Sequence, residues 1–204
     1  MLTLNLRYMT AHDIPEVVEI DRQSFDMPWS ARSYAFEVGE STYSHMLVLE
    51  TRHEEERGRL SRLLRRGGPA SPTHAIGAYG GLWYIGGEAH ISTIASAPLQ
   101  RGRGWGELAL AAMIRRSVTL RASHVVLEVR VSNVVAQRLY VKYGFETVGV
   151  KAHYYSSNGE DAYDMRLELQ NNPAYADFLT ERWAVLRNRH RFTDSYTEGS
   201  PPRL

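Results

Sequence analysis

Hydrophobic and polar positions along the first third of the chain predict a strand, two helices and two more strands. Apolar residues recur at mostly helical spacing over His12–Phe25, and Ser30 is placed to cap a second helix that runs to about Val38. Apolar alternation or short apolar runs, which are typical of strands, occupy Leu2–Tyr8, His45–Glu50 and Ala75–Trp83. This mixture of elements favours an α/β chain in which helices cover a sheet.

The second half of the chain has the order strand, helix, strand, helix, strand, strand. The strands are His90–Ala95, His124–Val131, Phe145–Lys151 and Ala162–Leu169, and the helices are Trp105–Thr119 and Val134–Tyr143. A further amphipathic helix is predicted over Ala174–Arg191, and the tail from Thr193 is predicted to be disordered. We therefore expect one domain over residues 1–170, followed by a C-terminal helix and a disordered tail over residues 171–204.

Residues 51–72 form a highly charged insertion between two predicted strands, and the insertion ends in Gly and Pro. Charge runs are usually solvated faces of a protein. One interpretation is therefore a solvated hairpin extension. The arginines of the segment leave open a second interpretation, in which it docks on an acidic partner such as ribosomal RNA.

Composition narrows the class of protein. The 204 residues suffice for one domain with a full core, and an apolar content of 43% argues against wholesale disorder. A net charge of +1 gives no case for nucleic-acid binding driven by overall charge. The polar N-terminus and the lack of an apolar run of about 18 residues predict neither a signal peptide nor a membrane span, so we expect a cytoplasmic protein.

The chain has no cysteine, which excludes disulfides, thiolate metal ligands and an acyl-cysteine intermediate. Its histidines show no metal-ligand spacing within a helix, so no zinc site is expected. Any group-transfer chemistry must therefore proceed without a cysteine nucleophile.

A glycine-rich loop, RGRGWG at residues 101–106, lies between a predicted strand and a predicted helix. Its glycines permit a close approach of the backbone to an anion, while the unpaired N–H groups and the dipole of the helix attract negative charge. The two arginines offer charge-assisted contacts to phosphate. Because the loop has neither a GxGxxG nor a P-loop pattern, both a pyrophosphate site and a structural turn remain open.

A carboxylate interrupts the predicted strand His124–Val131. One face of the strand has the apolar side chains of Val125, Leu127, Val129 and Val131, and the other face has Val126, Glu128 and Arg130. Glu128 is either a structural carboxylate paired with Arg130 or another arginine, or a general base. Tyr140 in the next predicted helix is a second candidate, although from spacing alone a tyrosine there is usually a core or rim residue.

Several motifs together resemble the GNAT superfamily of N-acetyltransferases. The loop at 101–106 is similar to its R/Q-x-x-G-x-G/A acyl-CoA signature. LEVRVSN at 127–133, LY at 139–140, GF at 144–145, YY-x-x-N-x-EDA-x-x-M at 154–165 and F-x-x-PWS at 25–30 resemble the bacterial ribosomal-protein-alanine N-acetyltransferases. The likeness covers roughly residues 4–169 without the insertion. It implies the GNAT fold, an α/β (or α+β) architecture with a central mixed, mostly antiparallel sheet and helices on both faces.

The resemblance also implies roles for individual residues. Glu128 matches the general base, Tyr140 the proton donor to the departing thiolate, and Asn133 a cofactor contact. The substrate-binding positions are Trp29, Tyr154 and Tyr155. The segments that match contacts to acetyl-CoA comprise Ile94, Ala95, Ser96, Arg101, Gly102, Arg103, Gly104, Trp105, Gly106 and Glu107. Glu107 departs from the expected pattern, because a basic residue would suit phosphate better.

The implied reaction is direct attack of a free amine on the acetyl thioester of acetyl-CoA, without a metal. A protein N-terminus, such as that of an alanine-starting ribosomal protein, is the favoured acceptor. Deprotonating an α-amine at neutral pH takes roughly 3–4 kcal/mol less than deprotonating lysine. A lysine or a small amine (a polyamine or aminoglycoside) remains an alternative acceptor, and a non-catalytic acyl-CoA-binding module remains an alternative function. No direct nucleic-acid role and no membrane association are expected, and the chain is either a monomer or a homodimer.

Overall fold

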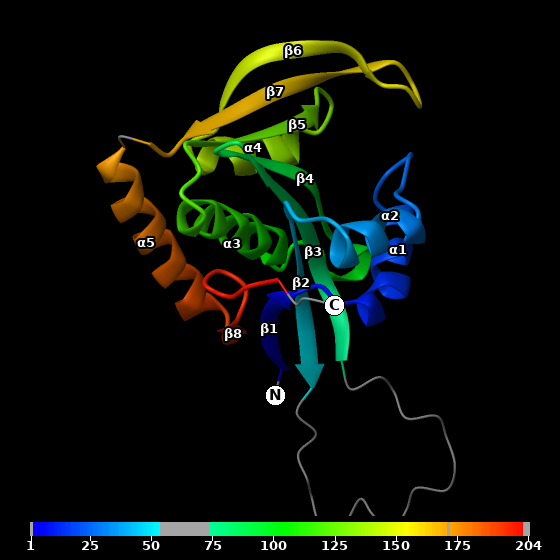
Figure 1. Cartoon of the computed structure of the whole chain (residues 1–204), viewed down its shortest axis with the longest axis vertical. Coiled ribbons are helices and arrows are strands. Elements are labelled where there is room, and N and C mark those ends of the chain that lie inside the picture. The colour runs from blue at the N-terminus through cyan, green and yellow to red at the C-terminus, as the bar shows by residue number, and fades with distance from the viewer. Residues whose placement is uncertain (1, 54–73, 171, 202–204) are drawn as a thin grey trace, which may run out of the picture.

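The computed structural model describes residues 2–53, 74–170 and 172–201. These residues form an eight-stranded sheet in the order β6-β7-β5-β4-β3-β2-β1-β8 (Figure 1). The strands are β1 (Leu2–Tyr8), β2 (Ser44–His53), β3 (His74–Ile85), β4 (Glu88–Ser96), β5 (His124–Arg130), β6 (Glu146–Tyr155), β7 (Glu160–Glu168) and β8 (Phe192–Asp194). The β4–β5 and β1–β8 pairs are parallel and the other pairs antiparallel, which confirms the predicted mixed, mostly antiparallel sheet.

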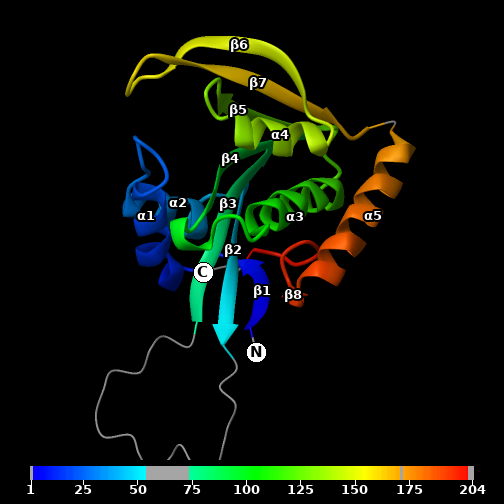
Figure 2. The same cartoon turned by 180° about the vertical axis from the view of Figure 1, so that it is seen from behind.

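Helices cover both faces of the sheet, as predicted. They are α1 (Ile14–Arg22), α2 (Ala31–Gly39), α3 (Trp105–Thr119), α4 (Val134–Lys142) and α5 (Pro173–Arg189). The first two lie on one face and the other three on the opposite face (Figures 1 and 2). Alternation along β2 separates two cores, because Leu47 and Leu49 join the cluster under α3 while Met46 and Val48 join the one under α1.

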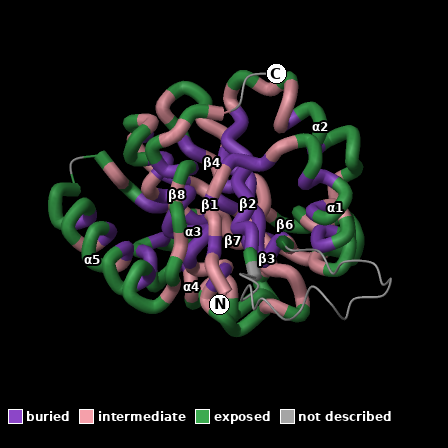
Figure 3. The backbone as a smooth tube through the Cα atoms, turned by 90° about the horizontal axis from the view of Figure 1, so that it is seen from below, coloured by how far each residue is buried: buried purple, intermediate pink, exposed green. Residues whose placement is uncertain are grey.

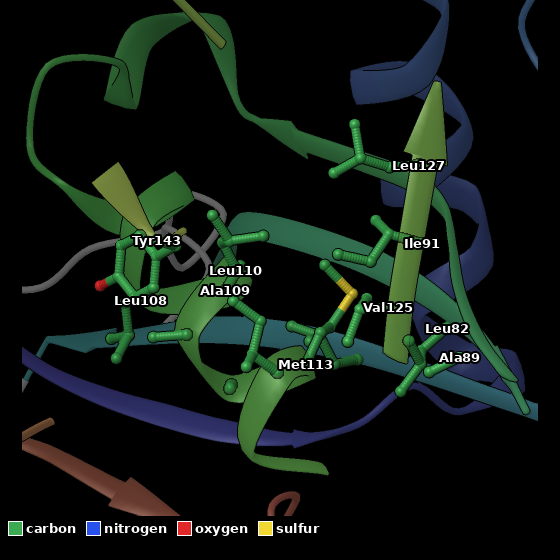
Figure 4. Packing of buried hydrophobic residues seen from close by; sticks show 14 of the residues in the cluster. Leu82, Ala89, Ile91, Leu108, Ala109, Leu110, Met113, Val125, Leu127 and Tyr143 are labelled. Carbon is green, nitrogen blue, oxygen red and sulfur yellow. The ribbon is translucent and has the colours of Figure 1, made fainter. Parts of the chain in front are cut away.

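Helix α3 forms the centre of the larger core. Figure 4 shows Leu108, Ala109 and Met113 of this helix among strand residues that include Ile91 and Val125, and all five belong to one buried cluster. Fully burying a side chain of the size of Leu or Met stabilises the fold by roughly 1.5–3 kcal/mol. The helix is therefore held firmly against the sheet.

The connection from α1 to α2 is longer than the sequence predicts. A 3-10 turn at Ala11–Asp13 precedes α1, which ends at Arg22 rather than at Phe25. Asp21 explains the early end, because its buried carboxylate accepts a hydrogen bond from the backbone N–H of Trp29 at 2.6 Å and fixes the chain that leaves the helix. Ser30 caps α2 as predicted, by accepting from the N–H of Ser33 at 3.0 Å.

The charged insertion lies largely outside the described residues. Thr51–His53 extend β2, and the remainder of the segment, 54–72, belongs to the part of the chain that is not described. Its two interpretations therefore stay predictions.

The prediction of a disordered tail from Thr193 is wrong for the tail residues that the structure describes. β8 pairs in parallel with β1, with Phe192 opposite Leu4. Tyr196 is fully buried, and its hydroxyl donates to the backbone oxygen of His45 at 3.0 Å. One large aromatic side chain, whose ring centroid lies 4.7 Å from that of Tyr8, thus anchors a segment whose Gly and Pro content suggested disorder. Figure 3 shows buried positions gathered in the strands, whereas much of α5 is exposed.

β4 and β5 diverge toward their C-terminal ends. Their parallel pairing covers three residue pairs and stops at His90–Val126, although β4 continues to Ser96 and β5 to Arg130. Ser92 is an extra residue in β4, between the positions that pair with Gly81 and Leu82 of β3. Such a bulge bends a strand and leaves one residue unpaired. The edge of β4 that faces β5 beyond His90 therefore has backbone groups without a strand partner.

Candidate active site

A cavity of about 680 Å³ lies where β4 and β5 diverge. Its walls come from the α1–α2 connection, the ends of β4 and β5, the start of α4, and the β6–β7 hairpin. The predicted site residues that line it are Trp29, Ile94, Glu128, Asn133, Tyr140, Tyr154 and Tyr155. Ala95, Ser96 and residues 101–107 are not among the lining residues, and they lie at the end of β4 and the start of α3.

Glu128 is an ionised carboxylate with two cationic or hydrogen-bonding partners. His90 Nε2 lies 2.8 Å from Glu128 Oε2, and Lys151 Nζ contacts Glu128 Oε1. Burial alone would raise the pKa of the Glu128 carboxyl, but the hydrogen bonds from His90 and Lys151 outweigh burial and lower this pKa to about 2. The partner is thus not an arginine, and Arg130 on the same strand face is bound elsewhere.

Tyr140 presents its phenol to the same cavity from α4. The residue is 6% exposed, and its ring centroid lies 5.9 Å from that of Phe145. Burial raises the pKa of the Tyr140 hydroxyl, so the phenol keeps its proton at neutral pH. Its hydroxyl makes no hydrogen bond to another described residue. Asn133 begins the helix, because its side chain accepts from the N–H of Ala136 at 3.1 Å.

The glycine-rich loop has the backbone that an anion site needs. Gly102 and Gly104 have φ of +77° and +83°, values that residues with a side chain rarely adopt. Gly104 is also the N-cap of α3. A Cβ on Gly106 would lie 3.1 Å from Ser96 Oγ, so the helix start packs closely on the end of β4. The first N–H groups of the helix are consequently available to a phosphate beside the divergence of β4 and β5.

The large side chain of the loop has another function. Trp105 is 3% exposed and packs against Gly77 in the core, so its backbone alone is left for a ligand. The two arginines remain at the surface. Arg103 lies over the Trp105 ring at 5.4 Å, and Arg101 donates to Ser24 Oγ at 3.1 Å.

The acidic residue after the loop is neutralised by its neighbours. Glu107 Oε1 accepts from Lys142 Nζ at 2.8 Å, from Arg182 Nη2 at 2.7 Å and from the Tyr143 hydroxyl at 3.1 Å. Burial would raise the pKa of Glu107, but these three donors lower it. The unexpected negative charge is therefore matched by two cations, and the arginines of the loop keep the start of α3 attractive to phosphate.

Arg130 joins two opposite walls of the cavity. Its Nη2 donates to Asp26 of the α1–α2 connection at 2.9 Å, and its Nη1 donates to Glu160 of β7 at 2.9 Å. Its guanidinium also lies 3.8 Å above the ring of Tyr155, which makes an edge contact with Tyr154 at 5.2 Å between centroids. This side of the cavity, between the α1–α2 connection and the β6–β7 hairpin, is therefore bridged by an ion-pair network and lined by aromatic rings.

Sequence reasoning missed His90 and Lys151. They are 38 and 23 residues from Glu128 in the chain, and strand pairing is what brings them together. His90 belongs to the last β4–β5 pair, opposite Val126, and its ring reaches the next residue on that face of β5, which is Glu128. The alternation of β5 did place Arg130 on the face of Glu128, but no pattern indicated its contact with Asp26.

Two further properties of the described chain concern metal-ligand groups and membrane-spanning helices. Within residues 2–53, 74–170 and 172–201, no group of three or more His, Cys, Asp or Glu side chains is placed to hold a metal ion. None of the helices in this part of the chain is long and apolar enough to cross a membrane.

Comparison with known proteins agrees with this geometry. Residues 15–145 match the model of the Acetyltransferase (GNAT) family. The chain is 35% identical over 157 residues, 77% of this chain and 90% of the relative, to a Bacillus subtilis (strain 168) protein named "Putative (ribosomal protein bS18)-alanine N-acetyltransferase". It is 36% identical over 110 residues, 48% of this chain and 68% of the relative, to N-alpha-acetyltransferase RimI of Mycobacterium tuberculosis (strain ATCC 25618 / H37Rv).

A solved structure supports the same fold. The ribosomal-protein-S18-alanine N-acetyltransferase of Escherichia coli superposes with a TM-score of 0.63 over 84% of this chain and 98% of that chain. Sequence identity in this superposition is 23%, so the likeness speaks for the fold alone.

Proposed function

The chain belongs to the GNAT family of acetyl-CoA-dependent N-acetyltransferases, and we propose that it acetylates the N-terminal α-amine of a protein, with an alanine-starting ribosomal protein as the favoured substrate. The observation that carries this proposal is the bridged acceptor side of the cavity. The Bacillus subtilis relative, whose name specifies alanine of ribosomal protein bS18, supports the choice of acceptor.

The bridge favours a chain end over an internal segment. Arg130 ties Asp26 to Glu160 across the acceptor side, so a polypeptide that continued in both directions would have to break this network. A free N-terminus has chain on one side only. Tyr154 and Tyr155 line the same space, and their hydroxyls suit the backbone groups of the first residues of a peptide.

The cavity is a poor site for a polyamine. Such a substrate carries several ammonium groups and needs carboxylates that are free to receive them. The carboxylates that line the cavity already have partners. Asp26 and Glu160 bind Arg130, Glu128 binds His90 and Lys151, and Asp21 binds Tyr79 and the N–H of Trp29. This pairing favours a substrate with a single amine at its reacting end.

The divergence of β4 and β5 fits acetyl-CoA. The free backbone edge of β4 around Ile94 can hydrogen-bond an extended chain, and the loop before α3 can hold phosphates. When bound, acetyl-CoA supplies the thioester carbon that the amine attacks. In this arrangement the β4 N–H groups near Ile94 are the candidates for stabilising negative charge on the acetyl oxygen.

Glu128 and Lys151 are proposed to manage the proton of the amine. A carboxylate with a pKa of about 2 is a weak base toward an ammonium group, whose reference pKa is near 7.7–8.0. The side chain of Lys151 is 41% exposed, so an entering amine can replace its ammonium group at Glu128 Oε1. This exchange removes one of the two contacts that lower the pKa of Glu128, and the carboxylate becomes a stronger base as substrate binds. His90 stays on Oε2 and keeps the carboxylate oriented.

Tyr140 is proposed as the acid. Its phenol is protonated at neutral pH, lines the cavity opposite β5, and has no described partner that would compete for its proton. A phenol so placed can donate its proton to the departing sulfur as the thioester bond breaks.

Release of CoA from acetyl-CoA with two peptides tests this function. One peptide has a free N-terminal alanine and no lysine, and the other has a blocked N-terminus and one internal lysine. We expect turnover on the first only, with a large loss in Glu128→Gln. Glu88→Gln is the matched control, because Glu88 forms the same 2.8 Å pair with a histidine, His124, on the same two strands but is not among the residues that line the cavity.

Two results would contradict the proposal. Turnover on the lysine peptide alone would make the protein a lysine or small-amine acetyltransferase. Acetyl-CoA binding without turnover on either peptide would favour a non-catalytic acyl-CoA-binding module.

A further inference from the structure

Helix α5 lies beyond the segment that matches the family model. The matched segment ends at residue 145, and α5 begins at Pro173. The helix runs beside α3 in both views of the fold (Figures 1 and 2). Its buried side chains are Tyr175, Leu179, Trp183 and Leu186. They make α5 an integral part of the core on the α3 side of the sheet.

Polar contacts fix α5 relative to the start of α3. The Tyr175 hydroxyl donates to the backbone oxygen of Tyr143 at 2.8 Å, and Arg182 Nη2 donates to Glu107 at 2.7 Å. Glu107 is one helical turn after Gly104, the N-cap of α3. The position of α5 is therefore set in part by Glu107, which directly follows the glycine-rich loop, and in part by the end of α4.

The C-terminal end of α5 reaches this loop. A Cβ on Gly104 would lie 3.3 Å from His190 Nε2 and 3.4 Å from both Cζ and Nη1 of Arg189. Arg189 is exposed, and no carboxylate of a described residue forms an ion pair with it. The Nε2 atom of His190 is buried and has no hydrogen-bond partner among the described residues. A buried polar atom that lacks a partner in the protein is the kind that a ligand completes.

The local charge favours an anion. Arg189 lies beside Gly104, the N-cap of α3, and Arg101 and Arg103 belong to the loop that leads into this helix. The acidic side chain of Glu107 is already bound by Lys142 and Arg182. Guanidinium groups bind phosphate through charge-assisted hydrogen bonds, and a helix N-terminus adds to this attraction.

We propose that Arg189 and His190 bind a phosphate of the CoA nucleotide, so that α5 forms part of the cofactor site. The proposal rests on the acetyl-CoA dependence of the family and does not depend on which amine the enzyme acetylates. It gives the C-terminal helix a direct contact with cofactor in addition to its packing.

Calorimetric titration of CoA into wild type, Arg189→Ala, His190→Ala and Arg22→Ala tests this inference. Arg22 is the control, because it is an exposed arginine that pairs with Glu19 within α1. This helix lies on the face of the sheet opposite α5. We expect Arg189→Ala to raise the Kd for CoA about tenfold, as loss of one charge-assisted hydrogen bond implies. His190→Ala should raise the Kd as well, Arg189→Lys should restore part of the affinity, and the control should match wild type.

Parallel titrations with 3′-dephospho-CoA identify the phosphate. If Arg189→Ala also binds 3′-dephospho-CoA more weakly than wild type does, the contact is to the diphosphate. If the two proteins bind this ligand equally well, the contact is to the 3′-phosphate. Thermal unfolding should be unchanged in Arg189→Ala, because the side chain is exposed. Kd values within twofold of wild type for Arg189→Ala and His190→Ala would overturn the inference while leaving the proposed function intact. Failure of wild type to bind CoA would overturn both.

Discussion

Replacing Glu128 with Gln tests the electrostatics that the structure assigns to the centre of the site. The pKa of Glu128 lies at about 2, compared with 4.5 for an ordinary glutamate. Each pKa unit corresponds to about 1.4 kcal/mol, so the folded protein gains about 3 kcal/mol from the ionised carboxylate and its partners. Because the folded pKa is below the unfolded one, this stabilisation is complete above pH 4.5 and is lost as the pH falls toward 2.

Urea unfolding of wild type and Glu128→Gln at pH 7, 5, 4 and 3 measures the stabilisation that the ionised Glu128 contributes. Glutamine does not titrate, so the variant lacks the acid-dependent loss. The difference in the free energy of unfolding should be constant from pH 7 to pH 5 and should shrink by about 2 kcal/mol by pH 3. Glu88→Gln serves as the control, because its exposed pair with His124 contributes little at any of these pH values.

A difference that does not change between pH 5 and pH 3 would refute the reasoning. It would mean that His90 and Lys151 do not hold Glu128 as described, and the exchange of Lys151 for the substrate amine would lose its basis.

Four further substitutions have expected outcomes. Tyr140→Phe should lower kcat for CoA release by about 10²-fold or more while KM for acetyl-CoA is unchanged, because it removes only a proton donor. Tyr155→Ala should raise KM for the alanine peptide without changing the Kd of CoA, measured by calorimetry, because Tyr155 lines the part of the cavity that we propose receives the acceptor. Tyr196→Ala should lower the free energy of unfolding in urea by about 3–5 kcal/mol, whereas a disordered tail would give no change. Gly104→Ala should cost about 1–2 kcal/mol of stability and weaken CoA binding, since φ is +83° and the new Cβ would face His190.

Local sequence patterns predicted most elements because those elements depend on short-range signals. Helix α3 has the predicted bounds of Trp105–Thr119, and β1 has those of Leu2–Tyr8. Apolar periodicity and glycine placement are sufficient for such segments. The end of α1 and the tail beyond Thr193 were mispredicted, because each depends on a distant partner. Asp21 holds the chain at Trp29, and Tyr196 packs against Tyr8.

In the candidate site, too, some residues were found from the sequence and others only from the structure. The resemblance to the GNAT family singled out Glu128 and Tyr140, and the structure places both around one cavity, although their catalytic roles stay predictions. The partners of Glu128 required strand pairing, since His90 belongs to β4 and Lys151 to β6.

The sequence by itself determined the family, the succession of strands and helices, and which side chains of each strand share a face, because these follow from motifs and from periodicity along one segment. Only the tertiary structure decided what surrounds those side chains. It lowers the pKa of Glu128, neutralises Glu107 and brings the end of α5 to the loop at Gly104. Electrostatic interactions depend on distances through space and on burial, and a linear pattern contains neither.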